Sequence, residues 1–266
     1  MGASVETARP NSRESIAARI AGDGRAPGRA WTALFARVVL FAALQSLVAL
    51  GLAIGGTDGA WDASVAWWPV SATVANLATI ALLIRLTRAE GIPLRALWNA
   101  SRATWKRDAL WFLAAFMALG PIAMLPSSLL ALTLWGDVNA GTAVMFRTLP
   151  LAAVVPLLVL FPISIALSEL PAYCGYALPR LQALTGRRGA TVLVVAAVFA
   201  LQHVALPLVF DWRFATWRLL MYAPFALFVT WAIDRRPTLM PYFMGMHAFI
   251  DLSVPIYVLL ASTGRL

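Results

Sequence analysis

Long apolar runs that are nearly free of charge recur along this chain, and they constrain its fold more than any other feature. Each run is about 18 residues or longer, and a helix needs about 20 residues to cross the hydrocarbon core of a bilayer. Charged residues make up only 12% of the 266-residue sequence and hydrophobic residues 61%, whereas soluble domains carry about 25% charged residues. The runs do not alternate with period two, as the strands of a membrane barrel would. The sequence therefore predicts an all-α, polytopic membrane protein.

The apolar runs between charged residues predict about seven transmembrane helices, within a range of six to eight. The third run contains Pro121 and Pro126, which predict a kink or a break in that helix. The expected spans cover residues 38–56, 63–84, 109–134, 149–170, 190–210, 217–233 and 239–260.

Basic residues are distributed unevenly between alternate connections. With the N-terminus inside, cytoplasmic segments hold 17 of the 21 Lys and Arg residues, Arg37 and Arg180 among them. Positive residues near span ends are retained on the cytoplasmic side, so the count predicts an N-in, C-out topology. This topology also accounts for the net charge of +9, and no nucleic-acid partner is expected. The outer segments hold Arg147, Arg213, Arg218 and Arg265.

The first 30 residues differ in composition from the rest of the chain. Residues 1–30 are polar, rich in Arg and interrupted by Gly and Pro, and they have no apolar core like that of a signal peptide. We expect a disordered cytoplasmic tail there, followed by a single transmembrane helical domain over residues 31–266. Nearly all the basic residues are Arg, which is consistent with a GC-rich bacterial genome. The expected location is therefore the bacterial cytoplasmic membrane, with membrane lipid around the protein.

Four ionisable residues lie inside the expected spans rather than in the connections. They come from three different spans. A charged residue at the centre of a membrane helix costs roughly 2.5 to 3.5 kcal/mol on insertion scales, and such residues usually face a protein interior or a wet cavity. We therefore expect one shared site. The four residues are Glu169, His203, His247 and Asp251.

The positions of these residues along their spans predict similar depths in the membrane. Glu169 and His247 each lie 11 residues from an arginine that marks the cytoplasmic end of the span, which corresponds to about 17 Å of helix. His203 and Asp251 each lie 15 residues from such an arginine, or about 22 Å. His247 and Asp251 are four residues apart and share a helical face, where the carboxylate can orient the imidazole.

Three short elements in the C-terminal third of the chain carry a family resemblance. They are Glu169 to Gly175 (ELPAYCG), Phe199 to His203 (FALQH) and His247 to Asp251 (HAFID). Their order and spacing resemble the CPBP family, the CAAX prenyl endopeptidase and bacteriocin-processing intramembrane proteases, also described as Abi/CAAX protease-like. Members carry Glu-Glu-x-x-x-Arg-Gly, Phe-x-x-x-His and His-x-x-x-Asn on successive membrane helices. The resemblance covers residues 169–251 and implies a catalytic core within residues 149–260.

By resemblance, the four intramembrane residues would be catalytic. Glu169 with His203 would activate a water molecule for attack on a peptide carbonyl, and His247 with residue 251 would stabilise the oxyanion. Residue 251 is Asp where the family has Asn, and an ionised carboxylate cannot donate a hydrogen bond to an oxyanion. We therefore expect Asp251 to orient His247 instead.

Two further motif positions have changed, and several neighbours have polar or aromatic side chains. The second Glu of the first element is Leu170, and its Arg is Cys174. Residues close to the motif are expected to support the catalytic groups, with helix packing favoured for Phe199. These supporting residues are Tyr173, Cys174, Phe199 and Gln202.

The expected activity is hydrolysis of a membrane-associated or lipidated peptide or protein, with no cofactor required when Glu169 is the base. A metal alternative uses the same groups, because imidazoles and carboxylates bind zinc and other divalent ions. A serine mechanism is disfavoured because no Gly-x-Ser-x-Gly surrounds the serines near the motif. An aspartyl mechanism requires the carboxylates of Glu169 and Asp251 to share a proton. The sequence carries no signal for an oligomeric state.

Two other classes of protein remain as alternatives. An ion- or proton-coupled transporter would use Glu169, His203, His247 and Asp251 as a relay, but the outer halves of these spans carry no continuing charge path. A catalytically impaired pseudoprotease would bind membrane peptides as an immunity or scaffold protein. The changed positions Leu170 and Cys174 favour that alternative.

Overall fold

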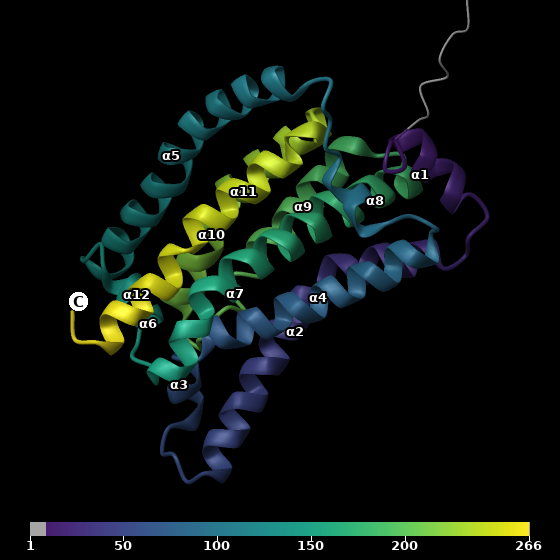
Figure 1. The fold of residues 1–266 in the computed structure, drawn as a ribbon. Coiled ribbons are helices and arrows are strands. Elements are labelled where there is room, and N and C mark those ends of the chain that lie inside the picture. The colour runs from purple at the N-terminus through teal and green to yellow at the C-terminus, as the bar shows by residue number, and fades with distance from the viewer. Residues whose placement is uncertain (1–8, 266) are drawn as a thin grey trace, which may run out of the picture.

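The computed structural model describes residues 9–265, and the described chain is all-α (Figure 1). Six segments are long and apolar enough to cross a membrane, and one further apolar helix, α9, is shorter. This confirms a polytopic helical membrane protein whose number of spans lies within the expected range of six to eight. The long segments are α2 (Ala26–Ile54), α4 (Trp68–Ala89), α5 (Trp105–Trp135), α7 to α8 (Leu151–Thr185), α10 (Trp212–Arg235) and the segment from η3 to α12 (Pro237–Ser262).

Within two of these segments the helix changes character. The first is divided into α7 (Leu151–Leu170), the π-helical η2 (Pro171–Ala177) and α8 (Leu178–Thr185). The last is divided into η3 (Pro237–Leu239), α11 (Met240–Asp251) and α12 (Ser253–Ser262). The remaining elements are α1 (Arg13–Ile20), α3 (Ala60–Val65), η1 (Leu94–Trp98), α6 (Ala140–Met145) and α9 (Arg188–Leu201).

The ends of two spans differ from the sequence expectation. Helix α2 begins at Ala26, 12 residues before the expected start at residue 38, because its arginines are compatible with helix and Arg37 is buried inside the bundle. Helix α9 ends at Leu201. Residues 202–210 were expected to continue the membrane helix, but they do not. They form turns with one isolated bridge between Ala205 and Leu208.

The prolines of the third span do not break it. Pro121 and Pro126 both lie inside the 31-residue helix α5, which is visibly curved (Figure 1). A proline removes a backbone donor and pushes against the preceding turn, and curvature rather than termination is the result here. Helix α5 packs along α10 at one edge of the bundle, and most of its surface faces outward.

The N-terminal segment corrects the expectation of a disordered tail over residues 1–30. Residues 13–20 form helix α1, whose N-terminus is capped by the side chain of Ser12, and α2 already begins at residue 26. Ile16 and Ile20 are buried, and α1 packs against α8. The apolar face of α1 consists of only Ile16 and Ile20, which is too short a pattern to predict a helix from the sequence. Residues 1–8 of the expected tail lie outside the described part of the chain.

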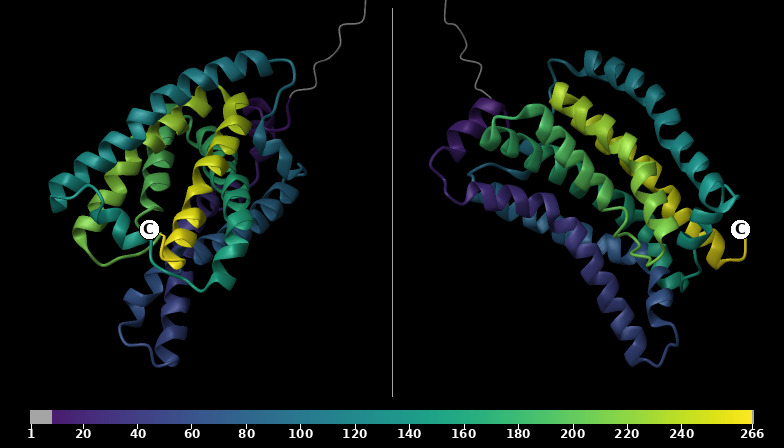
Figure 2. Two further views of the ribbon diagram at one scale, coloured as in Figure 1. Left: turned by 60° about the vertical axis from the view of Figure 1, so that its left-hand side comes forward. Right: turned by 180° about the vertical axis from the view of Figure 1, so that it is seen from behind.

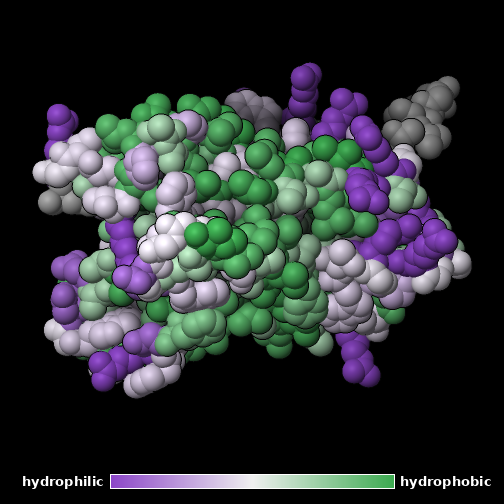
Figure 3. Space-filling model, turned by 90° about the horizontal axis from the view of Figure 1, so that it is seen from below, coloured by the Kyte–Doolittle hydropathy of each residue, from purple (hydrophilic) through white to green (hydrophobic). Residues whose placement is uncertain are grey.

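Helix α7 packs against several other helices and carries the first motif element. It packs against α4, α11 and α12, while α9 and α10 pack against each other beside it. The C-terminal half of α2, together with the short helix α3, forms a hairpin that projects from this bundle (Figure 2). Apolar side chains form a broad central band, with hydrophilic side chains gathered toward its two ends (Figure 3). The N-in, C-out orientation remains a prediction.

Candidate active site

The helix that carries Glu169 changes to a π-helix at Pro171. Pro171 has no N–H to donate to the preceding turn, and Pro179 has none to donate to the carbonyl of Gly175. The Gly175 oxygen instead accepts from Asn11 Nδ2 at 2.9 Å and from Arg180 Nη1 at 3.4 Å. The segment therefore stays helical from α7 to α8, as the depth argument required, and π-helical turns are frequent at functional sites.

Glu169, His247 and Asp251 are in direct contact. His247 Nε2 lies 2.7 Å from Glu169 Oε1 and 3.3 Å from Asp251 Oδ2. Within the described residues, neither of these buried carboxylate oxygens has another polar partner. Glu169 lies on α7 and the other two residues on α11, and these helices pack together. One imidazole nitrogen is thus shared by two carboxylates.

Asp251 contacts His247, as their i, i+4 spacing predicts, and its orienting role remains a prediction. An orienting carboxylate would be expected at one ring nitrogen while the other faces the reaction. Here Asp251 approaches Nε2, the same nitrogen that faces Glu169. It also has the most exposed side chain of the three, at 21%, compared with 10% for His247 and 2% for Glu169.

The other oxygen of Glu169 is held by two donors. Arg37 Nη2 donates to Glu169 Oε2 at 3.0 Å, and Gln202 Nε2 donates to the same oxygen at 2.7 Å. Gln202 Oε1 in turn accepts from Arg37 Nε at 2.8 Å and from the hydroxyl of Tyr173 at 3.1 Å. Gln202 and Tyr173, two of the expected supporting residues, are therefore part of one hydrogen-bonded network with the carboxylate.

His203 lies close to this network but makes no direct polar contact with it among residues 9–265. It follows the end of α9, and its Nδ1 lies 3.0 Å from the carbonyl oxygen of Phe199. Because a carbonyl only accepts, Nδ1 carries the proton and Nε2 has a free lone pair. The ring stacks on Tyr222 with centroids 3.6 Å apart.

Phe199 and Cys174 lie outside the hydrogen-bonded network of Glu169 and contact other side chains. Phe199 is fully buried and stacks on Tyr173, with centroids 5.0 Å apart. Its ring lies 6.3 Å from that of Phe225, which lies 6.2 Å from His247. Cys174 Sγ approaches Thr230 Oγ1 at 3.9 Å. Both side chains pack helices together, as favoured for Phe199, and neither touches Glu169.

Arg37 is the residue that the sequence argument missed. It was counted among the cytoplasmic charges, yet it lies about 17 Å along α2 and is 0% exposed. Two further partners hold its Nη1: Asn76 Oδ1 at 2.8 Å and Ser168 Oγ at 2.9 Å. The signal was present, because residues 26–54 remain mostly apolar on both sides of this arginine.

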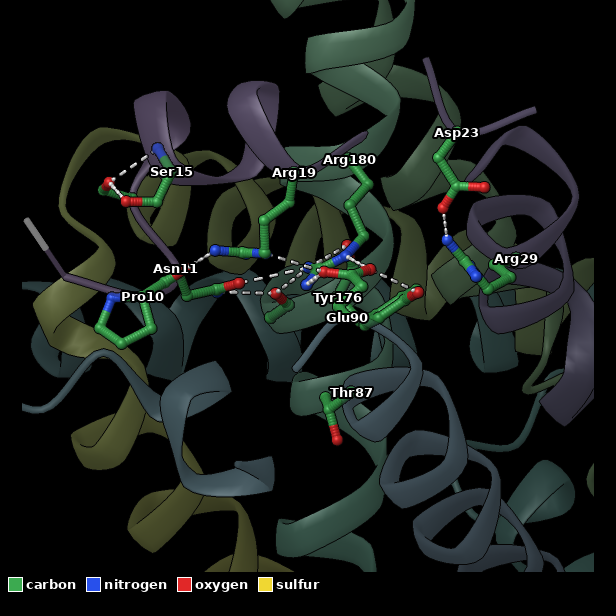
Figure 4. Close-up of polar contacts among 12 residues, drawn as sticks. Pro10, Asn11, Ser15, Arg19, Asp23, Arg29, Thr87, Glu90, Tyr176 and Arg180 are labelled. Atoms are coloured by element: carbon green, nitrogen blue, oxygen red, sulfur yellow. Dashed lines mark hydrogen bonds and ion pairs between the residues drawn. The ribbon is translucent and has the colours of Figure 1, made fainter. Parts of the chain in front are cut away.

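Two other arginines counted as loop charges are also buried. Arg180 binds Glu90 through Nε and Nη2 at 2.7 and 2.6 Å, and Glu90 also accepts from Tyr176 (Figure 4). Burial raises the pKa of the Glu90 carboxyl, but the hydrogen bonds and charge of Arg180 outweigh this and hold it below its usual range. Arg218 donates to the carbonyls of His203 and Leu206 at 3.1 and 2.6 Å.

The described donor set does not fit a divalent metal ion. His247 Nε2 and the facing oxygens of Glu169 and Asp251 lie against one another. The guanidinium of Arg37 and the amide of Gln202 already occupy the other oxygen of Glu169. Within residues 9–265, no group of three or more His, Cys, Asp or Glu side chains is arranged to hold a metal.

Together, the fold and the site define a polytopic helical membrane protein with carboxylate and imidazole groups buried between its helices. Residues 150–253 match the family model described as type II CAAX prenyl endopeptidase Rce1-like. This segment of the chain is therefore similar to the CAAX proteases, a family of hydrolases. No match was found among the curated proteins or the solved structures.

Proposed function

We propose that this protein is an intramembrane endopeptidase that hydrolyses a membrane-associated or lipidated peptide by means of a water molecule activated at Glu169. The observation that carries the proposal is the buried contact of 2.7 Å between Glu169 Oε1 and His247 Nε2. It joins a general base and a hydrogen-bond donor within the segment that matches the protease family. The cytoplasmic membrane of a bacterium is the proposed location.

In this mechanism Glu169 Oε1 accepts a proton from water as the water oxygen bonds to the peptide carbonyl carbon. The carbonyl oxygen becomes an oxyanion, and the His247 Nε2–H donates to it. The tetrahedral intermediate then collapses, the C–N bond breaks, and Glu169 returns the proton to the leaving amine. His203, protonated at Nδ1, accepts a hydrogen bond from the water at Nε2.

Charge balance supports this distribution of protons. Arg37 compensates Glu169, and a protonated His247 compensates Asp251, so the four groups together carry no net charge. Buried charges are stable only when paired in this way. A protonated His247 also offers the donor that Asp251, unlike Asn, does not supply when ionised.

The proposal is tested with a peptide that carries a farnesylated cysteine four residues from its C-terminus. Purified protein in liposomes is incubated with the peptide, and release of the C-terminal tripeptide is measured by mass spectrometry. We expect release by the wild type and loss by at least about 100-fold in Glu169→Gln. Glu90→Gln is the matched control, because Glu90 is also a buried glutamate paired with an arginine, and it should retain cleavage per folded molecule. Equal cleavage by wild type and Glu169→Gln, or none by the wild type, would contradict the proposal.

One observation favours a second candidate, a peptide-binding pseudoprotease. Both oxygens of Glu169 are already occupied, by Arg37, Gln202 and His247, and the family motif has changed at Leu170 and Cys174. Such a protein would bind the same farnesylated peptide without releasing the tripeptide. Binding measured by fluorescence anisotropy in the liposome samples separates the two functions.

A further inference from the structure

We propose that Arg37 is a positioning residue for Glu169: it fixes the orientation of the carboxylate so that one oxygen faces His247. Its Nη2 donates to Glu169 Oε2 at 3.0 Å, and Gln202 Nε2 donates to that oxygen at 2.7 Å. Oε2 therefore already accepts two hydrogen bonds, and Oε1 is left facing His247 Nε2 at 2.7 Å. The part of the inference that concerns turnover rests on the proposed endopeptidase function.

The guanidinium of Arg37 is itself fixed on every side. Its Nε donates to Gln202, and its Nη1 donates to Asn76 and Ser168. These partners come from α4, α7 and the turn after α9, while Arg37 lies on α2. Its side chain is 0% exposed. A planar fork with this many partners has one available orientation, so the carboxylate that it holds has one as well.

Arg37 lies outside the segment that matches the family model. The match covers residues 150–253, and both Arg37 and Asn76 precede it. Within that segment, position 174, where the family motif has Arg, is Cys, and its Sγ approaches Thr230 instead of Glu169. The positive charge beside Glu169 is thus supplied by α2, outside the matched segment.

A second buried Arg–Glu pair provides a matched control. The side chains of Arg180 and Glu90 are 2% and 4% exposed, compared with 0% and 2% for Arg37 and Glu169, and their closest atoms are 2.6 Å apart. Through Asn11 and Tyr176, this pair connects the segment before α1, the end of α4, η2 and α8 (Figure 4). Loss of either arginine removes a cation from a buried carboxylate and lowers stability. Only loss of Arg37 should alter the environment of the site imidazoles.

The chain contains only two histidines, His203 and His247, so imidazole NMR reports directly on the site. We would record ¹⁵N spectra of histidine-labelled wild type, Arg37→Gln and Arg180→Gln in nanodiscs. We expect Arg37→Gln to shift the His247 nitrogens and their pH titration, because the released carboxylate reorients. Arg180→Gln should lower the melting temperature and leave both imidazoles unchanged. Unchanged His247 signals in Arg37→Gln, or equal shifts in both variants, would overturn the proposal.

Two further variants cover the case in which Arg37→Gln does not fold. Gln202→Leu removes the other donor to Oε2 but leaves the Arg37–Glu169 ion pair in place, and we expect a smaller shift of the same His247 signals. Arg37→Lys keeps the charge but not the fork, and it should restore part of the wild-type spectrum. A fully wild-type spectrum in Arg37→Lys would overturn the proposal, because lysine lacks the planar fork that holds the carboxylate in one orientation.

The cleavage assay gives a separate readout of turnover. We expect Arg37→Gln to lower kcat by about 10- to 100-fold with KM nearly unchanged, which is the range for supporting residues of a catalytic group. A wild type that does not cleave the farnesylated peptide would remove the proposed function. The NMR comparison would still decide whether Arg37 positions Glu169.

Discussion

Arg37 Nη2 on α2 lies 3.0 Å from Glu169 Oε2 on α7, and the two residues are 132 positions apart in the sequence. Neither charge is stable alone in the interior of a membrane bundle. Each helix therefore depends on the other for its buried charge, and the pair fixes the rotation of α2 against α7.

This relationship makes the candidate site larger than the family segment. Residues 150–253 match the CAAX protease model, but the carboxylate within that segment is neutralised from α2. The guanidinium is in turn held by Asn76 on α4. The N-terminal helices are thus part of the site.

A charge of the wrong sign at Gln202 should disrupt this arrangement. Gln202→Glu replaces the donor that lies 2.7 Å from Glu169 Oε2 with an acceptor of like charge, at a position that is 0% exposed. We expect loss of cleavage and a destabilisation of about 3 to 5 kcal/mol, measured by tripeptide release and thermal unfolding. Gln45→Glu, at another buried glutamine, should be destabilised but cleave normally per folded molecule. Normal cleavage by Gln202→Glu would contradict the network.

Acidification should destabilise the protein through Glu90. Arg180 holds the pKa of Glu90 below its usual range in the folded protein, so the unfolded chain binds more protons than the folded one as the pH falls. The stabilisation is fully present above the unfolded pKa of about 4.3 and is lost as the pH falls through the lower folded pKa. In Glu90→Gln the melting temperature should be lower at pH 7 and should decrease less on acidification. Parallel curves for the two proteins would contradict this linkage.

Much of the fold and some of the site could be predicted from sequence, since both follow from burial and helical spacing. The apolar runs predict an all-α membrane protein because the bilayer sets their length. The i, i+4 spacing of His247 and Asp251 places them on one face, and the matched depths of Glu169 and His247 agree with their direct contact. Their catalytic roles remain predictions.

The rest could not be predicted because it depends on partners distant in sequence. From the sequence alone, Arg37 and Arg180 are counted as loop charges. Only the structure shows that each lies beside a buried glutamate, Glu169 and Glu90 respectively. His203 was expected in a helix, but α9 ends two residues earlier. Helix α1 is stable only because Ile16 and Ile20 pack on the rest of the protein.

A methyl group at Gly175 should strain the π-helical segment after Glu169. A Cβ there would lie 3.0 Å from the carbonyl oxygen of Leu97 and 3.1 Å from its Cβ. We expect Gly175→Ala to destabilise the protein by about 1 to 3 kcal/mol. Gly189→Ala is the control, because a Cβ there meets nothing within 4 Å. Equal melting temperatures for the two variants would show that η2 accommodates the extra atom.

Release of α1 should expose the N-terminal arginines. Ile16 is 0% exposed, and replacing it with Asp removes the buried contact and adds a charge, which costs about 2 to 5 kcal/mol. We expect Ile16→Asp to be cut by trypsin within residues 9–29 much faster than wild type. Ala18→Asp, at an exposed position of the same helix, should be cut at the wild-type rate. Equal protection of both variants would contradict the packing of α1.

Restoring the family residue at position 251 should test the proton distribution of the site. Asp251 Oδ2 lies 3.3 Å from His247 Nε2, so Asp251→Asn removes one negative charge next to the proposed oxyanion donor and supplies an amide N–H. We expect Asp251→Asn to cleave the farnesylated peptide at least as fast as wild type, whereas Asp251→Ala should be slower by about 10-fold or more. The Asn variant also needs no protonated imidazole for charge balance, so its cleavage should persist to higher pH than that of wild type. A loss of cleavage in Asp251→Asn as severe as in Asp251→Ala would mean that the carboxylate itself is required.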